Sequence, residues 1–156
     1  MMRPMRRNDR EKPREFALAV VDKCSYSMMA TVSPDGSPYC IPMSFARDGE
    51  WLFFHSASEG HKLDNLRHSN KVCVSCVGGQ NAIPGKFALQ FESAVIFGTA
   101  SEIVEKEEKI RALELISKRY TPANMPNFAD AIAKQLDVTS VWKIHIDEIS
   151  GKAREK

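Results

Sequence analysis

The sequence predicts a mainly β protein, built as a small antiparallel barrel of about six strands with peripheral helices. Two turn signals, at residues 34–37 and 47–50, lie about a dozen residues apart between aromatic and β-branched runs, as in an antiparallel meander. Helical patterns are few and flank this meander. The chain has 156 residues, which is enough for one domain with its own core.

The first half of the chain contains one helix and three strands. We expect the helix from about residue 12 to residue 24, with Pro13 in its first turn. The strands are expected at residues 27–33, 38–46 and 51–55. Pro38 and Pro42 lack an amide donor, so the second of these strands should be an edge or bulged strand.

The second half alternates short helices with longer strands. Ser58 is positioned to cap a helix over residues 59–69, with Leu63 and Leu66 facing inward. A strand at 71–77 and a loop at 78–85 precede a β-rich run at 86–104, in which Gly98 indicates a bulge. The rest comprises an amphipathic helix at 105–120, a loop with Pro122 and Pro126, a short helix at 127–136 and a strand at 138–149.

Positive charge is concentrated at the N-terminus. Residues 1–14 carry six basic side chains against Asp9 and Glu11, and the remaining chain is slightly acidic. We divide the chain into a basic arm (1–11) and one folded domain (12–152), and expect a solvated arm rather than nucleic-acid binding. No apolar signal segment or membrane-length run is present, so we expect a cytoplasmic protein without membrane contact.

The cysteine and histidine patterns predict no metal centre. Cys73 and Cys76 lie in a predicted strand, where residues three apart face opposite sides of the sheet. His61 and His68 are separated by about 10 Å along the predicted helix, and His145 stands alone in the last strand. We therefore interpret the thiols as buried or half-buried side chains.

Residues 53–62 are the most informative segment. A strand brings His55 and Ser56 to its end, and a helix starts shortly afterwards. The free N–H groups of a first helical turn bind anions. Lys62 and a protonated His61 place positive charge in that turn, which the helix dipole disfavours by up to about 1 kcal/mol per charge. A phosphate, with Ser56 as hydroxyl donor, would reverse this cost; the alternative is a lysine whose head is simply solvated.

Flat and flexible apolar side chains are abundant in the neighbouring strands. They are Met28, Met29, Met43, Phe45, Trp51, Phe53 and Phe54. These side chains could line a slot for a planar aromatic ligand, with Ser44 at its polar edge. They could equally form the core of the barrel, and the residues alone leave both interpretations open.

Five segments, in this order and spacing, resemble the FMN-binding split-barrel superfamily of the pyridoxamine 5′-phosphate oxidase type. The resemblance is closest to its 5-nitroimidazole-resistance (Nim-like) branch. The segments are residues 6–10 (RRNDR), 30–45 (ATVSPDGSPYCIPMSF), 51–77 (WLFFHSASEGHKLDNLRHSNKVCVSCV), 91–103 (FESAVIFGTASEI) and 141–152 (VWKIHIDEISGK). The corresponding strand of the oxidases proper carries an arginine that is missing here, which argues against pyridoxamine phosphate as the substrate.

The resemblance implies a split β-barrel that forms a homodimer with FMN at the subunit interface. By position, three residues would lie along the isoalloxazine ring: Pro42, Met43 and Ser44. Another four would lie near the ribityl chain and phosphate: His55, Ser56, His61 and Lys62. The partner subunit would contribute Ser93 and Trp142.

The resemblance also implies an FMN-dependent oxidoreductase that draws on a small electron donor and reduces nitroaromatic compounds such as 5-nitroimidazoles. His55 and Tyr39 are the candidate proton donors. Two alternatives remain open at this point. One is a flavin carrier or sensor without turnover, and the other is a split barrel that binds heme or a deazaflavin, with His55, His61 or His145 as the axial ligand of a heme.

Overall fold

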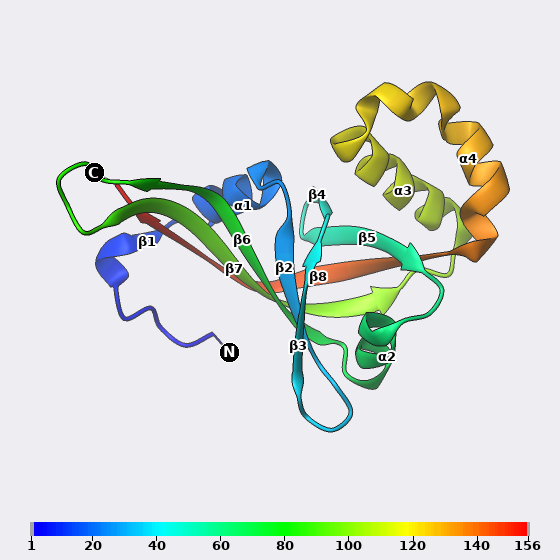
Figure 1. Cartoon of the computed structure of the whole chain (residues 1–156). Helices are drawn as coiled ribbons and strands as arrows, with labels where there is room; N and C mark the ends of the chain where they lie inside the picture. The colour runs from blue at the N-terminus through cyan, green and yellow to red at the C-terminus, as the bar shows by residue number, and fades with distance from the viewer. Residues whose placement is uncertain (1, 156) are drawn as a thin grey trace.

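The computed structural model describes residues 2–155; Met1, the first residue of the predicted basic arm, lies outside the described residues. One antiparallel sheet runs in the order β3-β2-β6-β7-β8-β5-β4, and β1 pairs with β8 (Figure 1). The strands are β1 (Glu11–Lys12), β2 (Ser27–Val32), β3 (Pro38–Met43), β4 (Ala46–Asp48), β5 (Trp51–Ala57), β6 (Lys71–Ala82), β7 (Leu89–Glu102) and β8 (Thr139–Arg154). The predicted fold class, an open or split barrel, is confirmed, with β1 and β4 as short additional strands.

The helices lie around the sheet. They are α1 (Arg14–Lys23), α2 (His61–His68), α3 (Lys106–Tyr120) and α4 (Phe128–Gln135). Figure 1 shows α3 and α4 beside the end of β5, and α1 lies against the long strands. The first helix begins at Arg14, two residues later than predicted, because Pro13 is its N-cap and has an extended backbone. No helix within residues 2–155 is both long enough and apolar enough to span a membrane.

Two strand predictions depend on special residues, and both are confirmed. The strand with Pro38 and Pro42 is β3, an edge of the sheet that pairs with β2. The pairing of β7 with β8 shifts register between Phe97 and Gly98. A Cβ at Gly98 would come within 2.6 Å of the His145 carbonyl oxygen, so the bulge requires glycine here.

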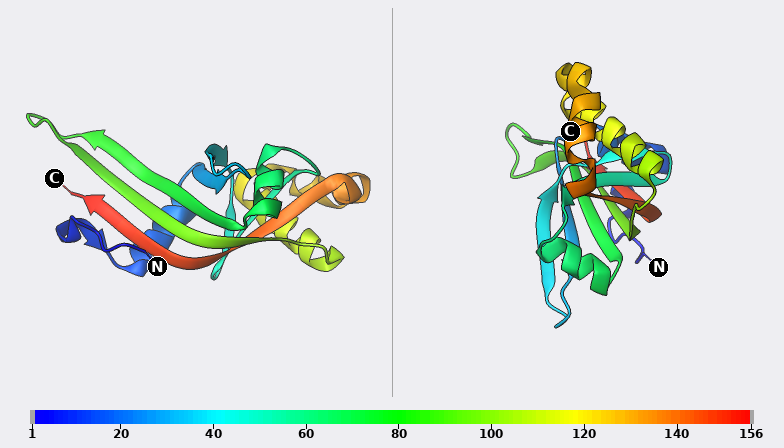
Figure 2. Two further views of the ribbon diagram at one scale, coloured as in Figure 1. Left: turned by 90° about the horizontal axis from the view of Figure 1, so that it is seen from below. Right: turned by 90° about the vertical axis from the view of Figure 1, so that its right-hand side faces the viewer.

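The predicted loop at residues 78–85 is wrong for residues 78–82, and only residues 83–85 lie in a turn. β6 continues to Ala82 and pairs with β7 along a long hairpin, which Figure 2 shows as a curved arm extending away from α3 and α4. A register shift between Val77 and Gly79 absorbs Gly78. A Cβ at Gly78 would lie 2.7 Å from the Lys23 side chain, so this glycine permits close packing of α1 rather than a loop. The last strand is also longer than predicted and extends to Arg154.

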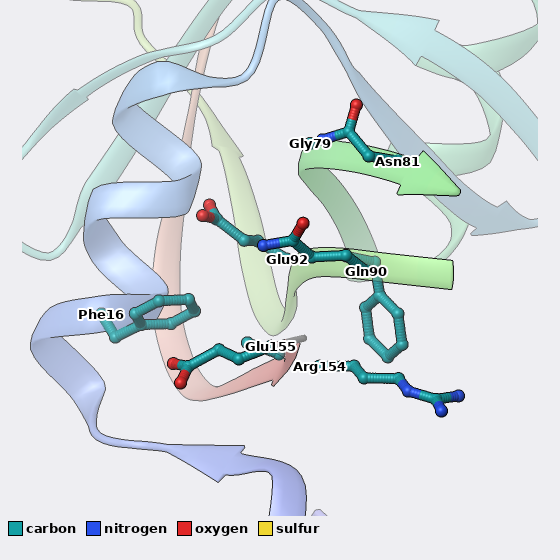
Figure 3. A pocket seen from close by; sticks show the side chains of 9 residues that line it. Phe16, Gly79, Asn81, Gln90, Glu92, Arg154 and Glu155 are labelled. Atoms are coloured by element: carbon teal, nitrogen blue, oxygen red, sulfur yellow. The ribbon is translucent and has the colours of Figure 1, made fainter. Parts of the chain in front are cut away.

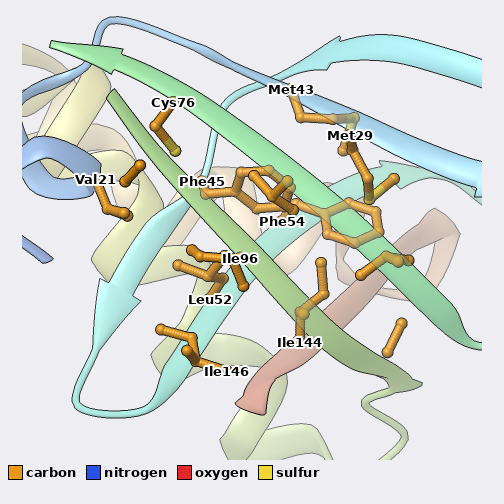
Figure 4. Packing of buried hydrophobic residues seen from close by; sticks show 14 of the residues in the cluster. Val21, Met29, Met43, Phe45, Leu52, Phe54, Cys76, Ile96, Ile144 and Ile146 are labelled. Atoms are coloured by element: carbon orange, nitrogen blue, oxygen red, sulfur yellow. The ribbon is translucent and has the colours of Figure 1, made fainter. Parts of the chain in front are cut away.

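The aromatic and methionine side chains mostly form the core. Met29, Met43, Phe45 and Phe54 are buried in one cluster with residues of α1, β6, β7 and β8 (Figure 4). Phe53 faces the opposite side of β5 and packs with α3 in a second cluster. The interpretation of these side chains as core, rather than as the lining of a slot, is therefore confirmed for the buried members.

Candidate functional site

The start of α2 is shaped by Gly60. The helix predicted over residues 59–69 is confirmed as His61–His68, but its predicted cap is wrong, because the N-cap is Gly60, without a side-chain cap, and not Ser58. Gly60 has φ 141° and ψ 166°, a conformation that is nearly restricted to glycine, and it turns the chain directly into the helix. His61 and Lys62 are therefore the first two helical residues, whose N–H groups have no carbonyl partner within the helix.

Lys62 is a half-buried cation in the first turn of α2. Burial lowers the pKa of its ammonium group. Among residues 2–155, no carboxylate forms an ion pair with it. The Lys62 ammonium thus lies in the positive end of the helix dipole, beside free amide groups. This arrangement suits a phosphate, since Asp64 in the same turn is exposed and forms no ion pair with Lys62 within residues 2–155.

His55 lies beside Lys62 and lines a cavity. The pKa of its imidazole is lowered, mainly by burial and additionally by the charge of Lys62, so the neutral ring is favoured. The cavity has a volume of about 150 Å³ and lies between the end of β5 and the helices α3 and α4. Its other lining residues are Leu113, Ser117, Phe128, Ala131, Ile132, Gln135, Leu136 and Thr139. Ser56, the next residue of β5, is half-buried and pairs with Ser140 of β8.

His61 connects the start of α2 to the β2–β3 hairpin. Its Nε2 atom is 3.1 Å from the Ser33 hydroxyl oxygen, and its ring packs against that of Tyr39, tilted by 31° with 3.9 Å between the centroids. Tyr39 was predicted as a proton donor, whereas Ser33 was not identified from the sequence. Ser33 and His61 are 28 residues apart, and no local pattern indicates their contact. The predicted residues Tyr39, His55, Ser56, His61 and Lys62 thus come from three segments that meet around α2.

The proposed ring segment forms a corner between β3 and β4. Pro42 and Ser44 are exposed, whereas the Met43 side chain points into the core, so only its backbone is available to a ligand. The corner is held from α3: the Phe45 carbonyl accepts hydrogen bonds from Arg119 at 2.5 Å and from the Tyr120 hydroxyl at 2.6 Å. Sequence reasoning missed both donors, because the contacts span more than 70 residues.

Ser93 lies apart from this group, whereas Trp142 lies next to Ser56, because it pairs with Phe54 and its neighbour Ser140 pairs with Ser56. Ser93 pairs with Val77, which is six residues along β6 from Lys71. Lys71 is the first residue of β6 and lies at the end of the strand near α2, so Ser93 is roughly 20 Å from that end. Trp142 is 3% exposed, stacks on Phe54 and donates its indole N–H to Ser140. In one chain, neither residue is placed next to Lys62.

A smaller cavity of about 80 Å³ lies at the other end of the molecule, between α1 and the strands β6, β7 and β8 (Figure 3). It is lined by Phe16, Glu92 and neighbouring polar side chains. The Glu92 carboxylate forms an ion pair with Lys23 of α1. None of the predicted site residues lines this cavity, and its internal pairing gives no indication of a ligand.

The chain also resembles known proteins. A family model described as pyridoxamine 5′-phosphate oxidase matches residues 13–153. A candidate 5-nitroimidazole antibiotic resistance protein from Bacteroides thetaiotaomicron is 25% identical, with a TM-score of 0.75, and the match covers 92% of this chain and 89% of that one. An FAD and heme binding protein from Mycobacterium smegmatis is 25% identical, with a TM-score of 0.79, and the match covers 94% and 74%.

The flavocytochrome Anf3 from Azotobacter vinelandii shares the fold at 22% identity, with a TM-score of 0.83 and coverage of 98% of this chain and 73% of that one. No curated protein matches the sequence. The fold is therefore one that is found in proteins described as binding flavin, heme or both.

Proposed function

Because the chain belongs to the pyridoxamine 5′-phosphate oxidase family, we propose that it is an FMN-dependent oxidoreductase that reduces small nitroaromatic compounds. The observation that carries the proposal is the pairing of an unsatisfied anion site at Lys62 with a small cavity at His55. The resemblance to a candidate 5-nitroimidazole resistance protein over nearly the whole chain supports the choice of acceptor.

The α2 start fits the phosphate of FMN. The N–H groups of His61 and Lys62 and the Lys62 ammonium would hold its oxygens, and the Ser56 hydroxyl is close in sequence to the same turn. A dianion at this position would offset the free-energy cost of burying the Lys62 charge and the unfavourable interaction of that charge with the helix dipole. Bound FMN supplies the electron or hydride transfer.

The cavity at His55 suits one aromatic ring. A volume of about 150 Å³ is enough for a benzene-sized ligand. It is well below the ~300 Å³ at which pockets for larger ligands begin, which disfavours a tetrapyrrole in this cavity. The neutral His55 imidazole can donate a hydrogen bond to a nitro group, while Leu113, Phe128 and Ile132 provide an apolar wall for the ring.

The ring segment at Pro42 and Ser44 is open to solvent, which supports a second copy of the chain as its cover. Ser93 lies too far along β7 to reach the α2 start of its own chain, as expected if it serves the site of a partner. The outer face of the sheet also exposes Val77 and Phe97. We therefore propose a homodimer with FMN at its interface, which gel filtration of the purified protein would show as twice the chain mass.

Absorbance and flavin titration test the proposal. We expect the purified protein to show flavin bands, or to acquire them with added FMN, and to bind FMN more tightly than riboflavin, which lacks the phosphate. Under anaerobic conditions, NADH or NADPH should bleach the flavin, and 2-methyl-5-nitroimidazole should reoxidise it. A Soret band without flavin would favour the heme alternative, and bleaching without reoxidation would favour a carrier. A protein that takes up no FMN would overturn the proposal.

A further inference from the structure

Two cysteines that the proposed function does not use are joined through one serine. Cys24 ends α1, and Cys76 lies on β6 directly opposite Ser27 of β2. The Ser27 hydroxyl oxygen is 3.4 Å from the Cys24 sulfur and 3.2 Å from the Cys76 sulfur. Both cysteines are buried, at 4% and 0% exposure. Two thiols that are 52 positions apart in the sequence therefore share one hydrogen-bonding partner in the core.

A cation from α3 lies against the same group. The Arg119 guanidinium donates to the Cys24 carbonyl at 2.8 Å and to the Val21 carbonyl at 3.1 Å, and the Cys24 thiol donates to that same Val21 carbonyl. The ionisable groups that face Cys24 are thus Cys76 from β6 and Arg119 and Tyr120 from α3.

These neighbours make the two thiols unequal. The hydrogen bond from Cys76, aided by Ser27 and by the charge of Arg119, lowers the pKa of Cys24 to about 6, against the effect of burial. The pKa of Cys76 is raised by the same pair and by burial. The two sulfurs therefore differ in how readily they ionise, as in redox pairs in which one cysteine attacks and the other resolves.

We propose that Cys24 and Cys76 are an oxidisable pair that a hydroperoxide converts into a disulfide between α1 and β6. The Cys24 thiolate attacks one peroxide oxygen, the O–O bond breaks, and the leaving oxygen takes up a proton. The Cys76 sulfur then attacks the sulfenic acid on Cys24, the S–O bond breaks, and water leaves with the Cys76 proton. With hydrogen peroxide, two thiols lose two electrons and two waters form.

The other cysteines provide an internal contrast. Cys40 is exposed on β3 and Cys73 is half-buried on β6, and both flank Ala30 in the sheet register. Burial, together with the neighbouring Cys40, raises the pKa of Cys73. Exposure alone would predict oxidation at Cys40, whereas the Ser27-bridged geometry assigns it to the buried pair.

The test uses the full chain with Cys40→Ala and Cys73→Ala, so that only the bridged pair remains. After peroxide treatment, removal of peroxide with catalase and denaturation in iodoacetamide, we expect loss of both alkylations and a cross-linked 24–76 peptide by mass spectrometry. Adding Cys76→Ser should leave a sulfenic acid on Cys24 that dimedone labels. Its labelling rate should rise less from pH 7 to 9 than the roughly 20-fold expected for a thiol of ordinary pKa, because the substituted hydroxyl and Ser27 keep hydrogen-bond donors beside Cys24.

Ser27→Ala separates the bridged geometry from mere burial. It should slow dimedone labelling of Cys24 about 2- to 5-fold at pH 6, because the thiolate loses a hydrogen-bond donor. A buried thiol could stay reduced simply because peroxide does not reach it. Equilibration in glutathione buffers avoids this limit, since local opening of the protein permits thiol–disulfide exchange over hours. Full alkylation of both thiols after peroxide and after glutathione equilibration would overturn the proposal. So would dimedone labelling of Cys76 in a Cys24→Ser variant at the same rate as labelling of Cys24 in the Cys76→Ser variant.

Discussion

Two half-buried cations, Lys62 at the start of α2 and Arg119 at the end of α3, have opposite relations to the protein around them. Arg119 donates to three carbonyl oxygens, those of Val21, Cys24 and Phe45, and lies over the ring of Tyr120. It also lies at helix C-termini, where positive charge is favoured. Lys62 lies in a first turn, where positive charge is disfavoured, and has no anionic partner among the described residues.

The difference distinguishes a cation that supports the fold from one that is available to bind a ligand. A half-buried cation that donates to three protein carbonyls contributes mainly to folding. A cation that the fold leaves unsatisfied costs stability in the free protein, and it recovers that cost when an anion binds. Arg119 should therefore matter mainly for unfolding, and Lys62 mainly for FMN affinity.

The largest effect is expected for Arg119→Ala. The substitution leaves three carbonyls without this donor, so the free energy of unfolding should fall by about 2–4 kcal/mol, measured by urea denaturation. Arg111→Ala on the same helix is the control, because Arg111 forms an exposed ion pair with Asp48 and should contribute at most about 1 kcal/mol. Equal losses for the two variants would contradict the structural role of Arg119.

Lys62→Ala should act on the ligand. We expect FMN affinity to fall by about 1–3 kcal/mol, or roughly 5- to 150-fold in Kd, because a charge-assisted contact to the phosphate is lost. Riboflavin affinity should not change, and the stability of the free protein should stay within about 1 kcal/mol. Lys86→Ala, in the turn between β6 and β7, is the control for net charge. An FMN affinity that Lys62→Ala leaves intact would remove this residue from the site.

Gly60→Ala tests the shape of the helix start. A Cβ at Gly60 meets no atom within 4 Å, so the cost is purely that of φ 141°, about 1–2 kcal/mol in stability with a parallel loss in FMN affinity. Gly79→Ala is matched to it, since that Cβ is also in open space and the backbone there is ordinary. If both variants behave alike, the unusual turn does not shape the phosphate site.

The same comparison explains which features the sequence predicts. The segment around Lys62 could be identified because His55, Ser56, His61 and Lys62 are close in sequence, so a strand end followed by a helix start is a local pattern. The role of Arg119 depends on contacts 74 to 98 residues away, which no window of sequence contains.

The predicted loop at 78–85 was wrong over residues 78–82 for a related reason. Gly78, Gly79 and Asn81 favour turns locally, but pairing with β7 across the whole hairpin overrides that preference. Pro42 and Gly98 were interpreted correctly, because a missing N–H and a missing Cβ restrict the backbone wherever they occur. Residue types with hard backbone constraints are therefore the more reliable guide.

Tyr120→Phe should have a modest effect. Its hydroxyl shares the Phe45 carbonyl with Arg119, so one donor remains after the substitution, and we expect a loss of about 0.5–1.5 kcal/mol in unfolding free energy. Urea denaturation of Tyr120→Phe and Arg119→Ala under the same conditions compares their losses in unfolding free energy. If Tyr120→Phe is the more damaging variant, the tyrosine and not the cation holds the β3–β4 corner.

The smallest effect is expected in the titration of His55, followed by NMR. Its pKa is lowered first by burial and then by Lys62, so in the free protein it should titrate below the ordinary value of 6.5. The neutral form is the favoured one, so the contribution of His55 to stability is complete above that pH and is lost as the pH falls below it. Inorganic phosphate or FMN at the α2 start would neutralise Lys62 and move the pKa of His55 upward, as would Lys62→Ala without ligand. If phosphate leaves the His55 titration unchanged while Lys62→Ala shifts it, the anion binds elsewhere, and Lys62 is only a strained surface cation.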